Sequence, residues 1–260
     1  MDSTSNIENT KNFCFPIPCL KDSRIKLVPF NISKHAQTVF DFTRQDPHAY
    51  AHLSFGPYDA VEGYEKLVKE LEEDKSVFTF AIMLRDRHQN PAASPFSDEN
   101  GLEGTVNIDE RKELGEEMVG TMAYCNANPE DRSTEISLVQ IFAKYRRRGF
   151  AVDAARLLLE YALTPVSAGG LGLARVEWHA STTNLGSIAV AQRLGFEKMG
   201  VIRYERFLKD GKERGKVGNG RSEVPPGTGV GDLWRDLVMF VAYWDAWVGG
   251  EGNIRTPTAQ

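Results

Sequence analysis

The 260-residue sequence has few cysteines, no long apolar run and no excess of positive charge. Its three cysteines, Cys14, Cys19 and Cys125, are few and odd in number, so they indicate no disulfide framework. No histidine cluster accompanies them, so we predict no metal site. No apolar run approaches a membrane span, and the polar start lacks the apolar stretch of a signal peptide. The net charge of -5 argues against a nucleic-acid partner. We therefore expect a soluble cytoplasmic protein with no membrane or nucleic-acid partner, as a monomer or homodimer.

Apolar residues make up 41% of the chain and charged residues 26%, as in an ordinary globular protein. Hydrophobic periodicity and turn residues predict the order strand, two helices, three strands, helix, strand, helix and further strands. The predicted ranges are 24–30, 33–42, 60–73, 76–84, 118–125, 133–142, 151–163, 175–180, 184–194, 196 onward and 233–247. Ser33 is the predicted cap of the first helix. Strand–helix–strand units in the second half imply a mixed sheet with helices on its faces.

Two boundaries divide the chain into three parts. We expect residues 1–23 to form an arm with little structure, residues 24–248 to form a single domain, and residues 249–260 to form a tail. Two long loops interrupt the domain. The polar stretch 86–115 is predicted to be a hairpin loop, because strands resume directly after it. The stretch 209–232 is rich in glycine, has almost no apolar side chains, and is predicted to be mobile.

The most informative segment is Lys144-Tyr145-Arg146-Arg147-Arg148-Gly149-Phe150-Ala151. It is strongly basic in an acidic protein, and it joins a predicted strand to a predicted helix. The backbone N–H groups at a helix start and the helix dipole favour an anion, and Gly149 lets a ligand approach the main chain. The segment is therefore either a pyrophosphate site or a solvated basic turn with a helix cap. A P-loop and a dinucleotide fingerprint are excluded, because the glycine-rich stretches elsewhere have the wrong spacing and context.

The segment resembles a known family. Arg146-x-x-Gly149-x-Ala151 fits the (Gln/Arg)-x-x-Gly-x-(Gly/Ala) signature of the GNAT superfamily of N-acetyltransferases. Asn184-x-x-Ser187, then Leu194-Gly195-Phe196, then Gly200-Val201-Ile202-Arg203 are similar to the branch that includes ribosomal-protein N-terminal acetyltransferases. The resemblance implies an α/β (α+β) fold. This fold has a mixed, mostly antiparallel central sheet, a parallel splayed strand pair and helices on both faces.

The resemblance also implies roles for particular residues. Acetyl-CoA would be the cosubstrate. Its pantetheine arm would bond the main chain of Val139 and Ile141 in the splayed pair, and the side chain of Asn184. Its phosphates would be cradled by a set of consecutive residues, namely Arg146, Arg147, Arg148, Gly149, Phe150 and Ala151. Ser187 would donate a hydrogen bond to the leaving thiolate, and Tyr204 is a second candidate donor. Asn184 and Ser187 are equally compatible with helix capping.

A carboxylate is needed to take a proton from the acceptor amine, because an ammonium group is not a nucleophile. We favour Glu135, which on simple alternation shares a side of its strand with Ser137, Val139 and Ile141. An exposed or ion-paired glutamate is the alternative. Glu177 and His179 share one side of the neighbouring strand and are further candidates, although a structural role suits His179 better.

The leading functional hypothesis is transfer of the acetyl group of acetyl-CoA to a primary amine by direct attack in a ternary complex. The acceptor would be a protein N-terminus or a small-molecule amine. The alternative is a catalytically weak or inactive acyl-CoA-binding module that keeps the fold, because the sequence offers no unambiguous base.

Overall fold

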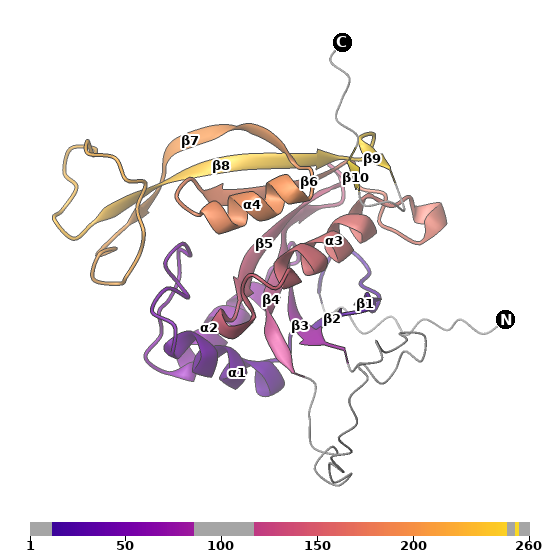
Figure 1. The fold of residues 1–260 in the computed structure, drawn as a ribbon, viewed down its shortest axis with the longest axis horizontal. Helices are drawn as coiled ribbons and strands as arrows, with labels where there is room; N and C mark the ends of the chain where they lie inside the picture. The colour runs from indigo at the N-terminus through magenta and orange to yellow at the C-terminus, as the bar shows by residue number, and fades with distance from the viewer. Residues whose placement is uncertain (1–11, 86–116, 249–252, 255–260) are drawn as a thin grey trace, which may run out of the picture.

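The computed structural model describes residues 12–85, 117–248 and 253–254, and Figure 1 shows their arrangement. The predicted loop 86–115 and most of the predicted tail 249–260 lie outside the described residues, as do residues 1–11. The strands are β1 (Leu20–Lys21), β2 (Ile25–Pro29), β3 (Phe78–Leu84), β4 (Met118–Asn128), β5 (Ser133–Ile141), β6 (Arg175–Ser181), β7 (Glu197–Leu208), β8 (Leu233–Tyr243), β9 (Trp247–Val248) and β10 (Asn253–Ile254).

Eight strands form one sheet in the order β1-β2-β3-β4-β5-β6-β8-β7, and β9 and β10 form a separate small ladder. Every pair of neighbours in the large sheet is antiparallel except β5 and β6, which run parallel. A parallel pair needs a crossover connection, and a helix between β5 and β6 supplies it. The predicted mixed, mostly antiparallel sheet is therefore confirmed.

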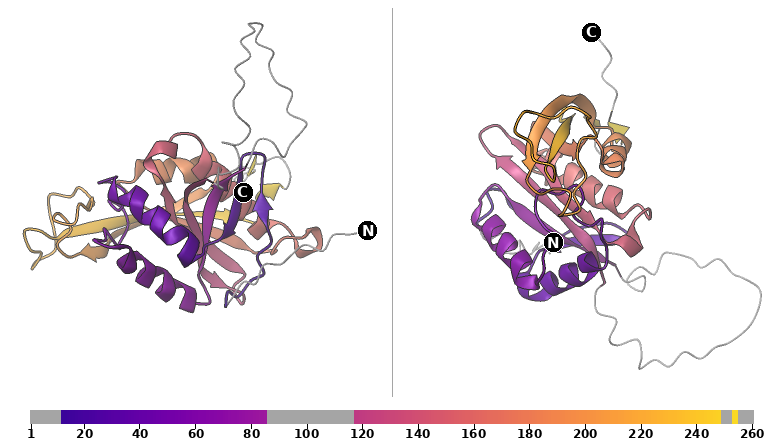
Figure 2. Two further views of the ribbon diagram at one scale, coloured as in Figure 1. Left: turned by 90° about the horizontal axis from the view of Figure 1, so that it is seen from below. Right: turned by 90° about the vertical axis from the view of Figure 1, so that its left-hand side faces the viewer.

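The helices are α1 (Ile32–Arg44), α2 (Val61–Glu73), α3 (Phe150–Leu163) and α4 (Leu185–Arg193), with short 3-10 turns at Ala143–Tyr145 and Val166–Ala168. Figure 2 shows α1 and α2 on one side of the sheet and α3 and α4 on the other. The apolar stripe predicted for α3 is confirmed. All five of its inward positions are buried, namely Val152, Ala155, Leu158, Leu159 and Ala162. The hydroxyl of Tyr124 on β4 donates to the carbonyl of Leu158, which fixes α3 against the sheet.

Two predictions about the N-terminal part are wrong. Asn31, not Ser33, caps α1: its side-chain oxygen accepts from the Lys34 N–H at 3.1 Å, and the Ser33 hydroxyl donates to that same oxygen. Residues 12–23 do not behave as an arm with little structure. Phe13 and Ile17 are buried in the main core, because they cover apolar side chains of the sheet beside α3.

The glycine-rich segment 209–232 has no helix or strand, as predicted, but the structure anchors it through polar contacts. Lys216 is only 6% exposed, and its ammonium group donates to the carbonyls of Tyr50 and Phe55 at 2.9 and 2.5 Å. Burial, and then the charge of Arg214, lower the pKa of Lys216 to about 8. The prediction of a mobile segment rested on its scarcity of apolar side chains. That scarcity carries no information about hydrogen bonds made by a buried lysine.

Asp236 on β8 anchors this segment at a second point, shortly after Lys216. The buried carboxylate of Asp236 accepts from the side chains of Asn219 and Arg221 and from the backbone N–H of Tyr204. Burial raises the pKa of Asp236, but the bonds to Arg221, Tyr204 and Asn219 outweigh burial, so its pKa lies below the usual value. Lys216 and Asp236 together fix the segment at two points, against the loop 45–60 and against β8.

Candidate active site

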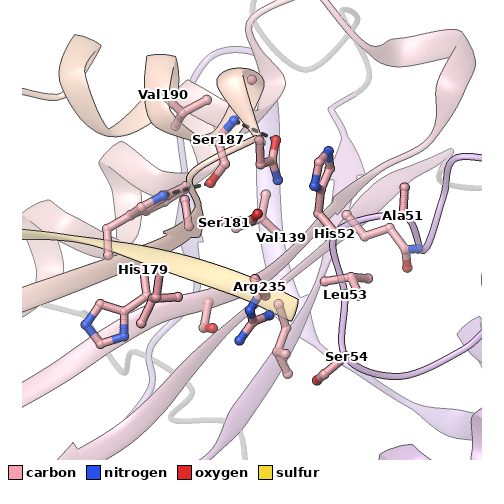
Figure 3. Close-up of a pocket in the computed structure, with 18 of the residues that line it drawn as sticks. Ala51, His52, Leu53, Ser54, Val139, His179, Ser181, Ser187, Val190 and Arg235 are labelled. Carbon is pink, nitrogen blue, oxygen red and sulfur yellow. Dashed lines mark hydrogen bonds between the residues drawn. The ribbon is translucent and has the colours of Figure 1, made fainter. Parts of the chain in front are cut away.

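The site is a cleft where β5 and β6 separate. The two strands pair only from Ser133 with Arg175 to Glu135 with Glu177, and beyond that point each continues without the other. A cleft of about 870 Å³ opens there, and Figure 3 shows part of its lining. The strands β5 and β6, the start of α4, the ends of β7 and β8, and the segment 48–55 all contribute residues to it. The predicted splayed pair is therefore present.

A β-bulge at Leu138 corrects the prediction about Glu135. Leu138 has a positive φ of 51°, and at this point two residues of β5, Leu138 and Val139, lie opposite one residue of β4, Met122. Side chains of cross-strand partners lie on the same face, so the bulge places Glu135 and Gln140 on one face and Ile141 on the other. Glu135 thus does not share a side with Ile141. Simple alternation failed because the bulge inserts one extra residue.

The main chain of Ile141 faces the gap. The N–H of Phe142 donates to the carbonyl of Val119 at 3.0 Å, which makes Ile141 and Gly120 a pair without mutual hydrogen bonds. The N–H and C=O of Ile141 therefore point away from β4, towards the cleft that Ile141 lines. Val139, in the bulge, also lines the cleft. Of the two predicted main-chain positions, Ile141 thus turns its main chain towards the gap, and Val139 belongs to the lining of the cleft.

The turn between β5 and α3 leaves a series of backbone donors unused. Within the described part of the chain, the N–H groups of residues 147–152 donate to no backbone or side-chain acceptor. Gly149 is the N-cap of α3, with φ of 88°, and the cleft extends to Arg146 and Ala151 beside it. Consecutive free N–H groups at a helix N-terminus suit a phosphate or pyrophosphate, so the turn fits the anionic end of a coenzyme.

The side chains of the same turn are less free than predicted. The guanidinium of Arg146 is paired with Asp46 and also donates to the carbonyl of Ile141 at 3.0 Å. Arg147 has a positive φ of 63° and is exposed, and the guanidinium of Arg148 lies over the ring of Tyr145. The ring of Phe150 is buried in the core. The structure thus brings all six predicted residues to one turn, where the main chain, Arg147 and Arg148 are the groups open to an anion.

Arg24, which directly precedes β2, contacts this turn and was not predicted. Its guanidinium donates to the carboxylate of Asp153 at 2.7 Å and to the carbonyl of Arg148 at 2.6 Å, and it lies over the ring of Phe150. A Cβ atom at Gly149 would lie 3.2 Å from Arg24 Nη1. No local pattern could reveal this contact, because the partners are more than a hundred residues apart in the chain.

Asn184 and Ser187 lie at the start of α4, where both line the cleft. Asn184 is the N-cap, and its side-chain oxygen accepts from the Ser187 N–H at 3.2 Å. The predicted capping role is therefore confirmed for Asn184. The indole N–H of Trp178, which is 1% exposed, donates to the hydroxyl oxygen of Ser187 at 2.9 Å. A hydroxyl that accepts in this way keeps its own proton free to donate. Figure 3 shows both bonds as dashed lines.

Glu135 lies at the vertex of the gap, buried and ion-paired. Its carboxylate accepts from the amide of Asn126 at 2.8 Å and lies 3.2 Å from Nδ1 of His179, whose Nε2 is 3.4 Å from Glu177. Burial raises the pKa of Glu135, but the hydrogen bond and charge of His179 outweigh burial, with smaller effects of Ser137 and Asn126, and the pKa lies below its usual value. Burial lowers the pKa of His179, but Glu135, followed by Glu177 and Glu205, raises it above its usual value.

The opposite wall of the cleft was not predicted. His52 lies on the segment 48–55 that lines it. Arg235 on β8 donates from Nε and Nη2 to a single carboxylate oxygen of Glu205, at 3.0 and 2.7 Å. Tyr204, a candidate donor, is not among the residues that line the cleft. Its hydroxyl donates to the carbonyl of Glu223, so the structure does not bring it to this site.

Between residues 12 and 254, with the gaps noted above, no helix is long and apolar enough to cross a membrane. Over the same ranges, no group of three or more histidine, cysteine, aspartate or glutamate side chains is arranged to hold a metal ion.

Comparison with known proteins gives a family and a fold. The model of the acetyltransferase (GNAT) domain matches residues 24–197. A probable acetyltransferase of the GNAT family from Chromobacterium violaceum ATCC 12472 is 20% identical, with a TM-score of 0.61, over 88% of each chain. The spermidine N-acetyltransferase from Vibrio cholerae, solved with CoA and spermine, is 14% identical, with a TM-score of 0.55, over 86% of this chain and 98% of that one. Comparison with curated protein sequences gives no match.

Proposed function

The chain belongs to the GNAT acetyltransferase family, and on that premise we propose that it transfers the acetyl group of acetyl-CoA to a primary amine. One observation carries the proposal. The gap between β5 and β6 ends at a turn whose backbone N–H groups, over residues 147–152, have no acceptor among the described residues. The main chain of Ile141 would hold the pantetheine arm along the gap, and the turn would hold the phosphates. A structural neighbour, the spermidine N-acetyltransferase from Vibrio cholerae, was solved with CoA, which supports CoA as the class of ligand.

The residues around the gap supply the groups that direct attack requires. The amine nitrogen bonds to the acetyl carbon, the bond between carbon and sulfur breaks, and the thiolate must gain a proton. Ser187, oriented by Trp178, would donate a hydrogen bond to the departing thiolate, because its hydroxyl proton is not used in the bond with Trp178. Glu135 would take a proton from the nitrogen as the amide forms, since its low pKa keeps it ionised at neutral pH.

The acceptor class is open between two groups of amines. An α-amino group has a pKa of roughly 8, so it loses its proton more readily than a lysine at about 10.4. Similarity of residues 184–203 to the ribosomal-protein branch favours a protein N-terminus, whereas the name of the Vibrio cholerae neighbour favours a polyamine. Cytoplasmic location and a monomeric or homodimeric state stay predictions from the sequence.

Calorimetric titration with CoA tests the cofactor assignment. Arg147→Glu should weaken CoA binding at least about tenfold, because it places a like charge beside the phosphates. Arg147→Gln should weaken it less, and it serves as the matched control at the same strained backbone position. Gly149→Glu alone would be ambiguous, since any side chain there meets Arg24 and a positive φ. Equal affinity of wild type and Arg147→Glu would contradict the assignment.

A panel of acceptors separates the enzyme from an inactive CoA-binding module. Release of free thiol from acetyl-CoA is followed with peptides carrying free N-termini, with polyamines and with small monoamines. The proposed function predicts thiol release that depends on one of these amines, with the acetyl group found on its nitrogen. Tight CoA binding without turnover across the panel would favour the inactive module.

A further inference from the structure

His52 carries a ring nitrogen that the fold leaves without a partner. Its Nδ1 is buried and has no hydrogen-bond partner in the described part of the chain. Only two other side-chain atoms of that part are buried without a hydrogen bond, and one of them, Nε2 of His179, belongs to a cleft residue and lies within ion-pair distance of Glu177. An unpaired buried polar atom costs stability, so its persistence inside a ligand cleft points to a bond made with a ligand.

The surroundings of His52 favour the neutral ring. Burial, and then the charge of Arg235, lower its pKa below the usual value. Besides His52, the titratable and charged residues that line the cleft are His48, Cys125, Glu135, Arg146, His179, Glu205, Arg206 and Arg235. The carboxylate of Glu135 is paired with His179, and that of Glu205 with Arg235. Neither carboxylate is therefore available to stabilise a protonated ring of His52. A neutral imidazole can accept a proton at neutral pH.

The position of His52 separates it from the cofactor turn. Figure 3 shows the ring projecting from the 51–54 segment towards the side of the cleft where Ser187 lies. The same segment faces Gln140, whose amide donates to the carbonyl of Ala49 at 3.2 Å. Gln140 and Glu135 share one face of β5, so His52 belongs to the α1–α2 side of the sheet. The phosphate turn begins α3, on the other side.

We propose that His52 accepts the first proton of the acceptor, from its ammonium group, and so delivers the neutral amine that attacks acetyl-CoA. This rests on the proposed function. In transfer from an ammonium group to a thioester, nitrogen loses two protons, and sulfur gains only one. His52 takes the first proton before the carbon–nitrogen bond forms and passes it to solvent. Glu135 takes the second as the carbon–sulfur bond breaks and then releases it to solvent. The thiolate leaves as the anion, hydrogen-bonded to the Ser187 hydroxyl, and takes its one proton from solvent.

The test compares His52→Ala and His52→Asn with Asp59→Asn, which changes an exposed residue of the loop 45–60 that does not line the cleft. At pH 7, kcat/KM of the two His52 variants should fall about a hundredfold, within the range of general-base catalysis, whereas Asp59→Asn should stay near wild type. The loss should shrink as pH rises towards the pKa of the acceptor, because the amine then arrives neutral. Added imidazole should restore part of the activity of His52→Ala. CoA affinity should be unchanged in all variants.

The outcomes separate the two proposals. If the wild type releases no thiol with any amine, the proposed function fails, whatever His52 does. If the wild type is active and the His52 variants keep its rate and pH profile, the role of His52 is overturned and the transferase survives. A uniform loss at every pH, without rescue by imidazole, also overturns it, since that result indicates a structural effect. NMR titration of the folded protein should place the His52 pKa below that of an ordinary histidine.

Discussion

The indole nitrogen of Trp178 lies 2.9 Å from the hydroxyl oxygen of Ser187, and this bond links the floor of the sheet to the first turn of α4. Trp178 is completely enclosed, with its ring edge-on to Phe196 at 6.0 Å between centroids. An indole nitrogen only donates, so the Ser187 oxygen must accept, and its proton is directed elsewhere. The sheet thus sets the orientation of a group on a helix beside the cleft.

Trp178→Phe should lower kcat about fivefold to tenfold, the equivalent of one neutral hydrogen bond, while CoA affinity stays close to wild type. The effect should depend on Ser187. In a Ser187→Ala background, Trp178→Phe should have little further effect on kcat, because the group that it orients is gone. Steady-state kinetics of the four proteins in this cycle measure the coupling. Fully additive losses would show that Trp178 acts on something other than Ser187.

The ion pair of Glu135 and His179 makes stability depend on pH in two windows. The folded pKa of His179 is raised, so its contribution is complete below the unfolded value of about 6.5 and is lost as pH rises through the folded pKa. The folded pKa of Glu135 is lowered, so its contribution is present above the unfolded value of about 4.3 and is lost as pH falls through the folded pKa.

The unfolding free energy should therefore decline less steeply in Glu135→Gln than in the wild type, both at acid pH, where Glu135 is protonated, and at higher pH, where His179 loses its proton. Urea denaturation from pH 3 to pH 9 measures both slopes. NMR titration of the same variant should show a lower pKa for His179, because the main carboxylate partner is gone. Glu177→Gln is the matched control, and its effect on the His179 pKa should be smaller, since Glu177 is the weaker contributor. An unchanged His179 pKa in Glu135→Gln would contradict the ion pair.

Lys216 should stabilise the protein more as pH rises. Its pKa is about 8 in the folded state and about 10.4 in an unfolded chain, so between these values the unfolded state binds more protons. The unfolding free energy of the wild type should gain from this residue across that window, and Lys216→Met should abolish the gain. At pH 7 the variant should lose about 1–3 kcal/mol, because two carbonyls lose their donor. Lys212→Met, on an exposed residue of the same segment, should change stability far less.

Asp236→Asn should release the segment 209–232 from β8. The asparagine cannot satisfy Arg221 as a carboxylate does, and the charge of the pair is lost. Limited trypsin digestion should then cut after Arg221 faster than in the wild type, at native pH and temperature. Cleavage after Lys216 should stay slow, since that side chain remains buried. First cuts within residues 133–203 in the variant would mean that the whole domain, and not this segment, has loosened.

Much of the fold could be predicted, because local patterns determine it. The apolar stripe of α3 follows the helical period. Gly195, with φ of 80°, directly follows the C-cap residue of α4, as predicted. The basic turn with Gly149 was found because a strand, a glycine and a helix follow one another directly in the chain. Each of these features depends on a few consecutive residues, which is the information that a single sequence carries well.

The wall of the cleft formed by the segment 48–55 could not be predicted, because it depends on contacts between distant residues. His52 and Lys216 lie in segments without periodic apolar positions, and their partners are on other elements. The pairing of Arg146 with Asp46 spans a hundred residues. The bulge at Leu138 had no signal either, since leucine rarely adopts a positive φ and nothing in the sequence marks the position.

The bulge at Leu138 has a consequence for the order of events in catalysis. On the N-terminal side of the bulge, Glu135 faces the α1–α2 side of the sheet. On its C-terminal side, Ile141 faces the α3 side, where the phosphate turn lies. On the proposed function, the two substrates reach the gap through separate entrances. Neither needs to leave before the other arrives, so initial-rate plots should intersect, as in a sequential mechanism, and CoA should inhibit competitively against acetyl-CoA alone.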